Sequence, residues 1–436
     1  MRQLQIPKNP SLTERSDLTL SMKFGFIGLG MGGCAIAAEC ASIRTGVTNN
    51  YYPYSGLLVN TNTQDFEKLD YQNNQIVPLP LKGYEKGAGR DINIGEKAFV
   101  EHKQTFIEHV ERHLQNRDFL WVVCGLGGGT GTGSVLQAID ALYQNGYEGR
   151  FGLILVLPRN GEGSKVFQNA LSRLQEIAGA MGALGSIIIV DNNKLYNECM
   201  EQNPNISMKE YASYANRYIA QTLHELNTVT SSFSPYGENH FDSSEFENMI
   251  KTPGVVHISR AMLEPSQVDL GNELSYLNDI RDSLNDGVLS SGYNIGNGKR
   301  AALSVLANNK TAQRMYQLSF HSQLENMMEE LVPRAQEKPV SYYIDNKAQQ
   351  MHFYGMVAGL GLPSRVEELL EENDRLERLQ KEATEEEDSV FAKLSSFKAP
   401  KEEEKEEKKS LFGDSPSTND SSETPKQKKS LFDLNI

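Results

Sequence analysis

The chain has 436 residues, which is enough for two ordinary domains and a tail. Its 57 acidic side chains outnumber the 43 basic ones and give a net charge of −14, so the surface as a whole does not attract nucleic-acid phosphates or anionic lipid. The sequence has no apolar run of about eighteen residues, and we therefore expect no membrane contact and a cytoplasmic location.

The N-terminal stretch and the cysteines give no sign of export or of metal binding. Residues 1–21 lack the apolar core of a signal peptide, and we expect them to form a flexible N-terminal extension. The cysteines contain no C-x-x-C pair; they are Cys34, Cys40, Cys124 and Cys199. This pattern predicts buried thiols in a reducing compartment, with no disulfide scaffold and no metal site.

Between residues 22 and 190, short apolar runs alternate with longer helical patterns. The runs are strand-sized and rich in Ile, Val, Leu and Phe, at 24–27, 56–59, 119–124, 151–157 and 186–190. Both faces of such strands must be covered, which predicts a mostly parallel sheet with helices on each side, for example over 35–41 and 134–143. The predicted fold class is therefore α/β, doubly wound.

A long helix and a second region follow. Aromatic and apolar residues from Tyr211 to Leu226 recur at spacings of three and four, which predicts one central helix over 206–231. Later segments predict two strands of a second α/β region and one surface loop, at 255–258, 301–305 and 285–297 respectively.

The C-terminal part is dominated by charge. Residues 367–388 are rich in Glu with interspersed Arg, Lys and Leu, which predicts a long solvated helix. From residue 389 onward Lys, Glu, Ser and Pro dominate, and a folded core is not expected. The pentamer Lys-Lys-Ser-Leu-Phe occurs at 408–412 and again at 428–432. Chance repetition and a short docking motif explain this repeat about equally well.

Two glycine-rich turns follow two of the predicted strands. The first, at 28–33, matches G-x-G-x-x-G and precedes a helix, so its backbone can approach a phosphate closely. Alone, this turn would suggest a dinucleotide-binding oxidoreductase that uses NAD. That class requires an acidic residue at the end of the second strand, but no carboxylate occurs there before Asp65.

The second turn, at 125–133, favours a different nucleotide site. Five glycines between positions 125 and 131 leave a run of unshielded backbone N–H groups that can surround an anion, and Thr130 and Thr132 add hydroxyls. A tight strand-to-helix turn alone would need only one or two glycines. So many glycines carry a large entropic cost on folding, which is hard to justify without a ligand.

This second turn also carries a resemblance to a known family. Residues 127–133 reproduce GGGTGTG, the signature of the tubulin/FtsZ superfamily of GTPases, and the order of motifs is similar from residue 23 to about 250. The resemblance implies a tubulin/FtsZ-like fold that binds GTP and GDP with Mg²⁺. The matching loops are a first phosphate loop at 28–34, the Asn60-Thr61-Asn62 loop, a γ-phosphate-sensing loop at 87–95, a ribose loop at 158–163 and a base-proximal loop at 192–195.

The resemblance implies a set of nucleotide contacts. Tyr211 or Tyr214 would stack on the guanine and Asn216 would bond its edge, although packing in the core remains an alternative for at least one tyrosine. The chain departs from the family at Ala35, where Asn is usual. The implied contacts are Gly30, Gly32, Gly33, Cys34, Asn60, Gly87, Ala88, Gly89, Arg90, Gly127, Gly128, Gly129, Thr130, Gly131, Thr132, Gly133, Pro158, Glu162, Asn192, Tyr214 and Asn216.

The predicted catalytic residues lie just past the central helix. Family members similar to FtsZ place N-x-D-x-x-D here, and this chain has His240, Asp242 and Glu245 at the three positions. The resemblance implies that the two acids reach the GTP of the next subunit, where a carboxylate can orient and deprotonate the attacking water. The alternative is that Asp242 and Glu245 only form a helix-capping box. We expect Asp242 to be the more important acid.

An active site divided between subunits implies that hydrolysis requires assembly. The expected product is a dynamic head-to-tail filament that grows at one end and shortens at the other. The sequence over 34–40, the Asn60-Thr61-Asn62 variant and the Glu-rich helix before a Lys-punctuated tail resemble the plasmid-segregating branch of the superfamily. That branch implies a DNA-binding adaptor protein bound to the tail, and only indirect contact with plasmid DNA.

Two other classes remain open at this stage. A division-type GTPase similar to FtsZ would end in a short apolar, Pro-containing motif, which residues 431–436 match poorly. An NAD-dependent oxidoreductase is disfavoured by the ending of the second strand and by the second glycine turn. The predicted organisation is an extension at 1–21, a GTP-binding domain at 22–205, the central helix at 206–231, a second, GTPase-activating domain at 232–364, a charged helix at 365–390 and a disordered tail at 391–436.

Overall fold

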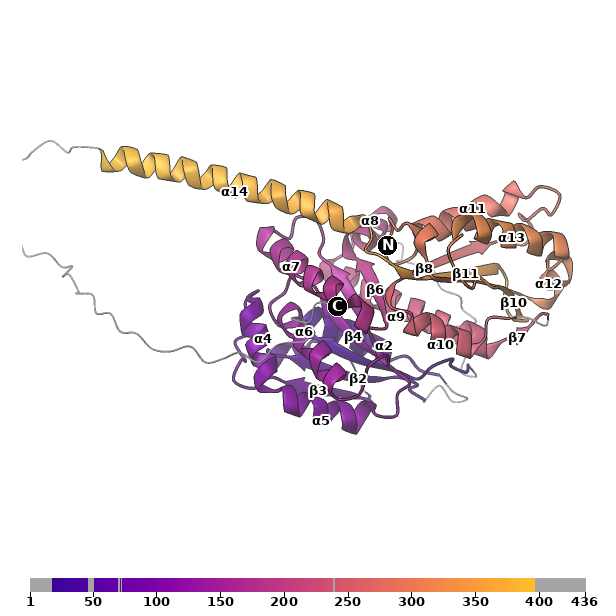
Figure 1. Cartoon of the computed structure of the whole chain (residues 1–436), viewed down its shortest axis with the longest axis horizontal. Helices are drawn as coiled ribbons and strands as arrows, with labels where there is room; N and C mark the ends of the chain where they lie inside the picture. Colours follow the sequence, from indigo (N-terminus) through magenta and orange to yellow (C-terminus); the bar gives the residue numbers. More distant parts are fainter. Residues whose placement is uncertain (1–17, 46–50, 70, 72, 238–239, 397–436) are drawn as a thin grey trace, which may run out of the picture. The chain divides into compact units, whose positions relative to one another are not determined.

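A computed structural model of the chain describes residues 18–45, 51–69, 71, 73–237 and 240–396 (Figure 1). The chain divides into two compact units, Met1–Asn373 and Asp374–Ile436, and each is described by itself. The repeated Lys-Lys-Ser-Leu-Phe elements lie outside the described residues. In the part of the chain that the structure describes, no helix is long and apolar enough to cross a membrane.

The first unit is built on a parallel sheet that contains all five strands predicted before residue 191. Its strands occur in the order β3-β2-β1-β4-β5-β6, and their burial on both faces agrees with continuous apolar sequence. The strand β3, which the sequence analysis missed, is an edge strand and contains two prolines. The bounds are β1 (Phe24–Leu29), β2 (Ser55–Asn60), β3 (Ile76–Pro80), β4 (Phe119–Gly125), β5 (Phe151–Leu157) and β6 (Ser186–Asp191).

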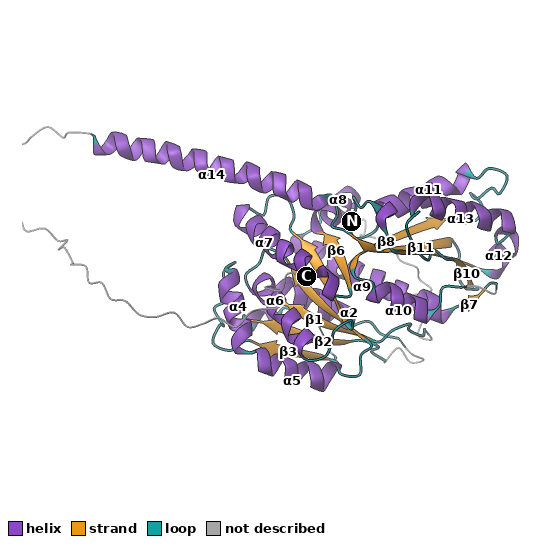
Figure 2. Ribbon diagram, viewed as in Figure 1, coloured by secondary structure: helices purple, strands orange, loops and turns teal. Residues whose placement is uncertain are grey.

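Helices cover both faces of this sheet (Figure 2), as the doubly wound pattern predicts. Two of them are N-capped by aspartates, because the side chains of Asp91 and Asp191 accept the backbone N–H groups of Asn93 and Asn193. The helices are α2 (Gly30–Ala41), α3 (Gln64–Glu67), α4 (Ile92–Glu101), α5 (Lys103–Leu114), α6 (Thr130–Gln144), α7 (Ser164–Ala180), the 3₁₀ turn η1 (Met181–Ala183) and α8 (Asn192–Gln202).

The predicted central helix is α9 (Met208–Ser232), which begins with a capping box between Ser207 and Glu210. It runs from the carboxyl ends of the parallel strands to their amino ends. Near its start, the Tyr211 hydroxyl donates to the backbone oxygen of Asn192, just beyond the carboxyl end of β6 (3.0 Å). Near its other end, the Asn227 side chain bonds both the N–H and the C=O of Met22, just before β1 begins (2.9 and 2.8 Å).

The sheet continues into the second region through a short parallel pairing of β6 with β8. Parts of β8 (Gly254–Leu263) and β9 (Arg300–Ala307) were predicted from the sequence, whereas β7 (Ser234–Pro235), β10 (Val340–Ile344) and β11 (Met351–Leu360) were not. The predicted loop at 285–297 is shorter than expected, because α11 runs to Asp286 and a 3₁₀ turn begins at Ile295. The further strand order is β8 (Gly254–Leu263), β11 (Met351–Leu360), β9 (Arg300–Ala307), β10 (Val340–Ile344) and β7 (Ser234–Pro235).

The remaining helices of this region are α10 (Ser243–Lys251), α11 (Leu274–Asp286), the turn η2 (Ile295–Asn297), α12 (Asn309–Met315) and α13 (Leu318–Leu331). A buried ion pair joins α9 to β8, with Arg260 Nη1 2.9 Å from Glu225 Oε2 and exposed fractions of 5% and 1% for the two side chains. The Tyr354 hydroxyl on β11 donates to the same carboxylate oxygen (3.2 Å). These contacts connect the central helix to the second half of the sheet.

The C-terminal helix α14 (Arg365–Ser395) confirms the long charged helix predicted over 367–388. Its residues up to Asn373 belong to the first unit, where Arg365 and Leu369 are buried. From Asp374 onward the helix belongs to the second unit, and most of its described side chains are exposed.

Candidate functional site

A cavity of about 290 Å³ opens at the carboxyl ends of β1, β2 and β4, where ligands bind in open α/β sheets. It brings together four loops that are far apart in the sequence. Ten of the residues predicted to contact nucleotide line it: Gly30, Gly32, Asn60, Gly87, Ala88, Gly89, Gly128, Gly129, Thr130 and Gly131.

The two glycine turns touch each other at this cavity, which explains why they need glycine. Gly30 has a φ of +68°, and a Cβ added there would lie 2.8 Å from the backbone nitrogen of Gly131. A Cβ on Gly131 would in turn lie 2.6 Å from the carbonyl oxygen of Leu29. By contrast, a Cβ on Gly128 would meet nothing within 4 Å. The glycines therefore serve both close packing of the loops and an open cavity.

Two helix N-termini supply hydrogen-bond donors to the cavity. The helices α2 and α6 begin at Gly30 and Thr130, and neither has a side-chain cap on its first N–H groups. Such unpaired N–H groups and the positive end of the helix dipole favour an anion. Hydroxyls add to this environment, since Thr61 Oγ1 and Thr130 Oγ1 lie 2.8 Å apart. The arrangement fits a polyphosphate.

The third loop of the cavity contains Gly87, Ala88 and Gly89 and is followed by an exposed Arg90 with a φ of +66°. The Asn169 side chain on α7 fixes this loop against the second glycine turn. Its Nδ2 donates to the carbonyl oxygens of Arg90 (2.9 Å) and Gly127 (3.1 Å). Asn169 was not among the sequence-predicted residues, because a side chain that bonds only backbone has no motif of its own.

Five of the predicted contacts lie behind the cavity wall and do not line it. Thr132 is buried, and its hydroxyl accepts the N–H of Gly127 (2.8 Å) and so closes the second turn internally. Burial raises the pKa of the Cys34 thiol, whose Sγ bonds backbone carbonyls of the first two strands. The residues behind the wall are Gly33, Cys34, Gly127, Thr132 and Gly133.

Several lining residues were not predicted, and Asp65 is the most informative of them. It follows β2 by five residues, in the short helix α3, and lines the phosphate cavity. Its Oδ2 accepts from Asn60 Nδ2 (3.1 Å), and Asn62 also lines the cavity. Mg²⁺ prefers oxygen ligands such as carboxylate, amide and hydroxyl oxygens. In phosphate sites it is usually bound by one or two carboxylates together with the phosphate itself. The residues present therefore fit that ion.

The residues predicted for ribose and base do not line this cavity: Pro158 and Glu162 follow β5, Asn192 begins α8, and Tyr214 and Asn216 lie within α9. Glu162 Oε1 accepts the N–H of Arg159 (2.8 Å), and Asn192 accepts the Tyr211 hydroxyl. Tyr214 instead stacks on Tyr218, with ring centroids 5.9 Å apart and an angle of 11° between the ring planes. The structure thus places Tyr211, and not Tyr214, against the base-proximal loop. The remaining predicted residues, Pro158 and Asn216, are buried and half-buried respectively.

In the structure, the two predicted catalytic acids, Asp242 and Glu245, form a helix-capping box. Asp242 caps α10, its Oδ1 accepting the N–H groups of Ser244 (2.8 Å) and Glu245 (2.9 Å), and Glu245 Oε2 accepts the N–H of Asp242 in return (3.0 Å). Both bonds to Asp242 use Oδ1, and the side chain is exposed. The cap therefore holds the carboxylate in one orientation and leaves Oδ2 directed away from the helix N–H groups.

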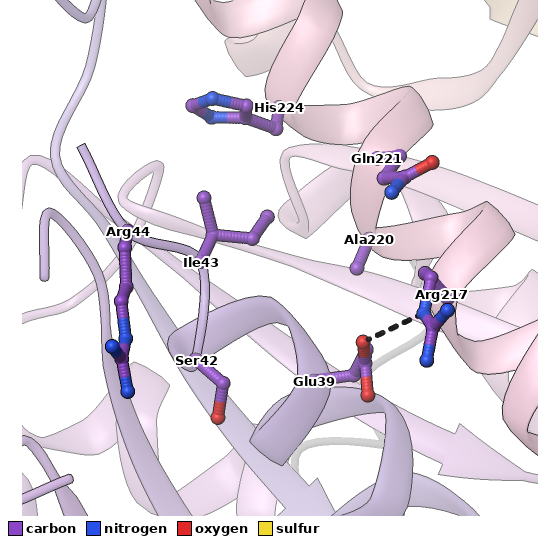
Figure 3. Close-up of a pocket in the computed structure, with 8 residues that line it drawn as sticks. All are labelled: Glu39, Ser42, Ile43, Arg44, Arg217, Ala220, Gln221 and His224. Carbon is purple, nitrogen blue, oxygen red and sulfur yellow. Dashed lines mark ion pairs between the residues drawn. The ribbon is translucent and has the colours of Figure 1, made fainter. Parts of the chain in front are cut away.

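A second hollow, of about 320 Å³, lies between the end of α2 and the middle of α9 (Figure 3). Arg217 and Glu39 form an ion pair across it at 3.6 Å (Figure 3). Neither glycine turn contributes to its lining, and it faces the carboxyl end of α2, which favours cations. The lining residues are Glu39, Ser42, Ile43, Arg44, Arg217, Ala220, Gln221 and His224.

Comparison with known proteins agrees with this geometry. The "Tubulin/FtsZ family, GTPase domain" matches residues 23–200, and "Tubulin-like protein TubZ, C-terminal domain" matches residues 239–364. The tubulin-like protein TubZ of Bacillus cereus is 43% identical over 422 residues, covering 94% of this chain and 97% of the relative. The cell division protein FtsZ 1 of Pyrococcus abyssi is 26% identical, covering 59% of this chain and 63% of the relative.

Solved structures show the same fold. The crystal structure of a GTPγS-form protofilament of TubZ from Bacillus thuringiensis serovar israelensis has a TM-score of 0.73 to this chain. It is 20% identical and covers 87% of this chain and 98% of that one. The predicted tubulin/FtsZ-like fold is thus confirmed.

Proposed function

The chain belongs to the TubZ family of the tubulin/FtsZ superfamily and carries its GTPase domain, and from this premise we propose that a second copy completes its active site. GTP binds in the phosphate cavity of one subunit, and Asp242 of the next subunit in a filament supports its hydrolysis. The separation of cavity and acid within one chain carries this proposal.

The phosphate cavity and Asp242 lie toward opposite ends of the parallel strands. The phosphate cavity is at the carboxyl ends of the strands, whereas the end of α9 contacts the amino end of β1 through Asn227 and Met22. Asp242 follows the end of α9 by ten residues. A helix of 25 residues is about 37 Å long at 1.5 Å per residue. Asp242 follows the end of α9 that is remote from the predicted guanine site, which supports its action on the GTP of a neighbouring subunit.

Each part has a defined task in hydrolysis. The unpaired N–H groups of the glycine turns and the hydroxyls of Thr61 and Thr130 hold the β- and γ-phosphates. Asp65 and Asn62 are the residues that would hold Mg²⁺, which supplies charge neutralisation when bound. Asp242, held by its cap, orients the attacking water and accepts its proton. Tyr211 is a better candidate for stacking on guanine than Tyr214, because Tyr211 lies against Asn192 whereas Tyr214 stacks on Tyr218.

A head-to-tail contact of this kind repeats without closing and gives a filament. By family membership, we propose that the filament moves plasmid DNA in the cytoplasm through a DNA-binding, TubR-like adaptor held by the tail, with no membrane partner. The repeated Lys-Lys-Ser-Leu-Phe elements are the candidate docking segments, and the acidic chain suits a basic partner. A chain ending at residue 396 should still hydrolyse GTP but fail to retain DNA-bound adaptor in a pull-down. Retention equal to that of the full chain would exclude tail docking.

Mixing two inactive variants tests the divided site. Asp242→Asn keeps the GTP cavity but removes the carboxylate, and Gly128→Glu fills the cavity with charge while keeping Asp242. A Cβ at position 128 meets no atom within 4 Å and the longer side chain extends into the cavity, so the change should not disturb folding. Each variant alone should be inactive, and the mixture should regain turnover, because the acid of one faces the GTP of the other. A mixture as inactive as its components, although the two variants co-sediment, would show that each chain uses its own acid.

A further inference from the structure

The first residue of the C-terminal helix is a buried arginine that contacts the loop predicted to hold ribose and the aspartate that precedes the predicted base-proximal loop. The Arg365 side chain is 4% exposed. Its guanidinium donates to Asn160 Oδ1 (2.6 Å) and to the carbonyl oxygen of Pro158 (3.4 Å), both after β5. It also pairs with Asp191 at the end of β6, with 3.4 Å between Nε and Oδ1, and with Glu368 one turn along α14 (2.7 Å). All these residues belong to the first unit.

The same contacts fix the two loops relative to each other. Asp191 is the N-cap of α8 and accepts the N–H of Asn193 (2.9 Å), so the Arg365 partner also sets where α8 begins. The backbone N–H of Asn160 donates to Asn193 Oδ1 (3.3 Å), which joins the ribose loop to the base-proximal loop. Asn192, next to this junction, receives the Tyr211 hydroxyl. One guanidinium therefore supports a network that ends at the start of α9.

Stability alone is a poor reason for this arrangement. Burying a guanidinium is costly, and well-packed apolar residues commonly stabilise a fold as well or better. Arg365 Nε also has no hydrogen-bond partner within the described residues, although it lies near Asp191. The guanidinium bonds two positions of the ribose loop and is ion-paired with Asp191, which precedes the base-proximal loop, so it sets the spacing of these segments in a way that an apolar side chain cannot. One helical turn later, Leu369 is fully buried and fixes the same side of α14.

We propose that Arg365 is a positioning residue for guanosine, and that it couples nucleotide binding to the root of the C-terminal helix, residues 365–373. This inference rests on the proposed guanine-nucleotide site. Nucleotide that fills the ribose and base loops stabilises the partners of Arg365 and so orders this root. Because such coupling is reciprocal, a contact that stabilises the root of α14 should in turn raise nucleotide affinity.

The test compares Arg365→Met with Arg365→Lys and with Arg281→Met, an exposed ion-pair control on α11. Fluorescent GDP and GTP are titrated into each full-length protein below the concentration at which it assembles. For Arg365→Met we expect both affinities to fall by the same factor, roughly tenfold, because the phosphate cavity is unchanged. Arg365→Lys keeps the charge but loses the forked guanidinium, so its nucleotide affinities should lie between those of Arg365→Met and the unmodified protein. The affinities of the Arg281→Met control should match those of the unmodified protein.

Hydrogen exchange provides the readout that a merely structural role would not change. Adding GDP should slow amide exchange over residues 365–373 in the unmodified protein and in Arg281→Met, but not in Arg365→Met. Nucleotide affinity unchanged in Arg365→Met would overturn the positioning role, as would loss of GTP affinity alone. If GDP does not change amide exchange over residues 365–373 in the unmodified protein, the proposed coupling is wrong. If Arg365→Met fails to fold, Arg365→Lys decides by the same criteria. A chain that binds no guanine nucleotide at all would instead refute the proposed function.

Discussion

Arg260 and Glu225 form a buried ion pair, with 2.9 Å between Nη1 and Oε2, that connects the central helix to the second half of the sheet. Removing one partner leaves the other charged and buried. We expect Glu225→Gln to lower the free energy of unfolding by about 3–5 kcal/mol. Replacing both residues by Met should cost less than this single change. Urea unfolding of the nucleotide-free protein measures the effect.

The matched control for this pair is the exposed one between Lys251 and Glu247 on α10. Glu247→Gln should change the free energy of unfolding by less than about 1 kcal/mol, since water solvates whichever charge remains. Equal effects of Glu225→Gln and Glu247→Gln would contradict the role given to burial.

Two glycines of the same turn should respond very differently to alanine. Gly131→Ala brings a Cβ to 2.6 Å from the Leu29 carbonyl oxygen and must separate the two turns, whereas Gly128→Ala enters open space. We expect Gly131→Ala to destabilise the fold by about 1–3 kcal/mol. It should also weaken GTP binding by more than tenfold, while Gly128→Ala binds within a few-fold of the unmodified protein. Calorimetric titration with GTP distinguishes the two variants, and comparable loss in both would show that the turns do not need their close contact.

Substitutions of Asp242 can separate its cap from its chemistry. Asn and Ser also cap helices well, so Asp242→Asn and Asp242→Ser should fold normally, whereas Asp242→Ala loses about 0.5–2 kcal/mol. All three should retain polymer but lose turnover, by roughly 10²- to 10⁴-fold, since none has a carboxylate to accept a proton. Glu245→Gln keeps the reciprocal cap and should lose less GTP turnover than the Asp242 variants. Phosphate release measured alongside sedimentation makes this comparison. Full turnover in Asp242→Asn would mean that the carboxylate is only a cap.

The stability of the fold should depend on pH through His257. Burial lowers the pKa of this histidine to about 4, and a buried Nδ1 without a hydrogen-bond partner in the described residues gives an added proton no acceptor. The unfolded chain takes up that proton near pH 6.5, so the folded state loses stability as the pH falls from about 6.5 toward 4. The loss from this one group is on the order of 3 kcal/mol.

His257→Gln isolates this contribution. The Gln amide can keep the donor that Nε2 provides to the Leu284 carbonyl oxygen (2.6 Å) but takes up no proton. Thermal unfolding between pH 4 and 7 should show a shallower decline for the variant than for the unmodified protein. Parallel curves would place the acid sensitivity in other groups.

Ten of the nucleotide contacts predicted from local patterns line one cavity. The glycine turns were recognisable because several of their glycines meet a local need, such as the positive φ of Gly30 or the close approach of Gly131 to Leu29. The parallel strands were predicted because burial on both faces requires continuous apolar sequence. The capping box of Asp242 and Glu245 was also visible as a spacing of three, although spacing alone could not decide between capping and catalysis.

Contacts between distant parts of the chain were not predictable in this way. Asp65 enters the cavity because α3 turns back after β2, and Arg365 meets Asp191 from the far end of the chain. The strands β10 and β11 were missed because they complete a sheet whose other strands lie elsewhere in the sequence. The choice of Tyr211 over Tyr214 likewise depends on what each ring meets, and both rings follow the same helical period.

The junction between β6 and β8 is narrow, with only two paired positions, Ser186 with Gly254 and Ile187 with Val255. Tension applied along a polymer would meet little resistance from the strands at this point. The continuous rod of α9, tied to Met22 at one end and to Asn192 near the other, is the stiffer route for force. In the filament proposed above, a subunit under load would therefore transmit force along α9, between the side of the sheet with the glycine-lined cavity and the side with Asp242.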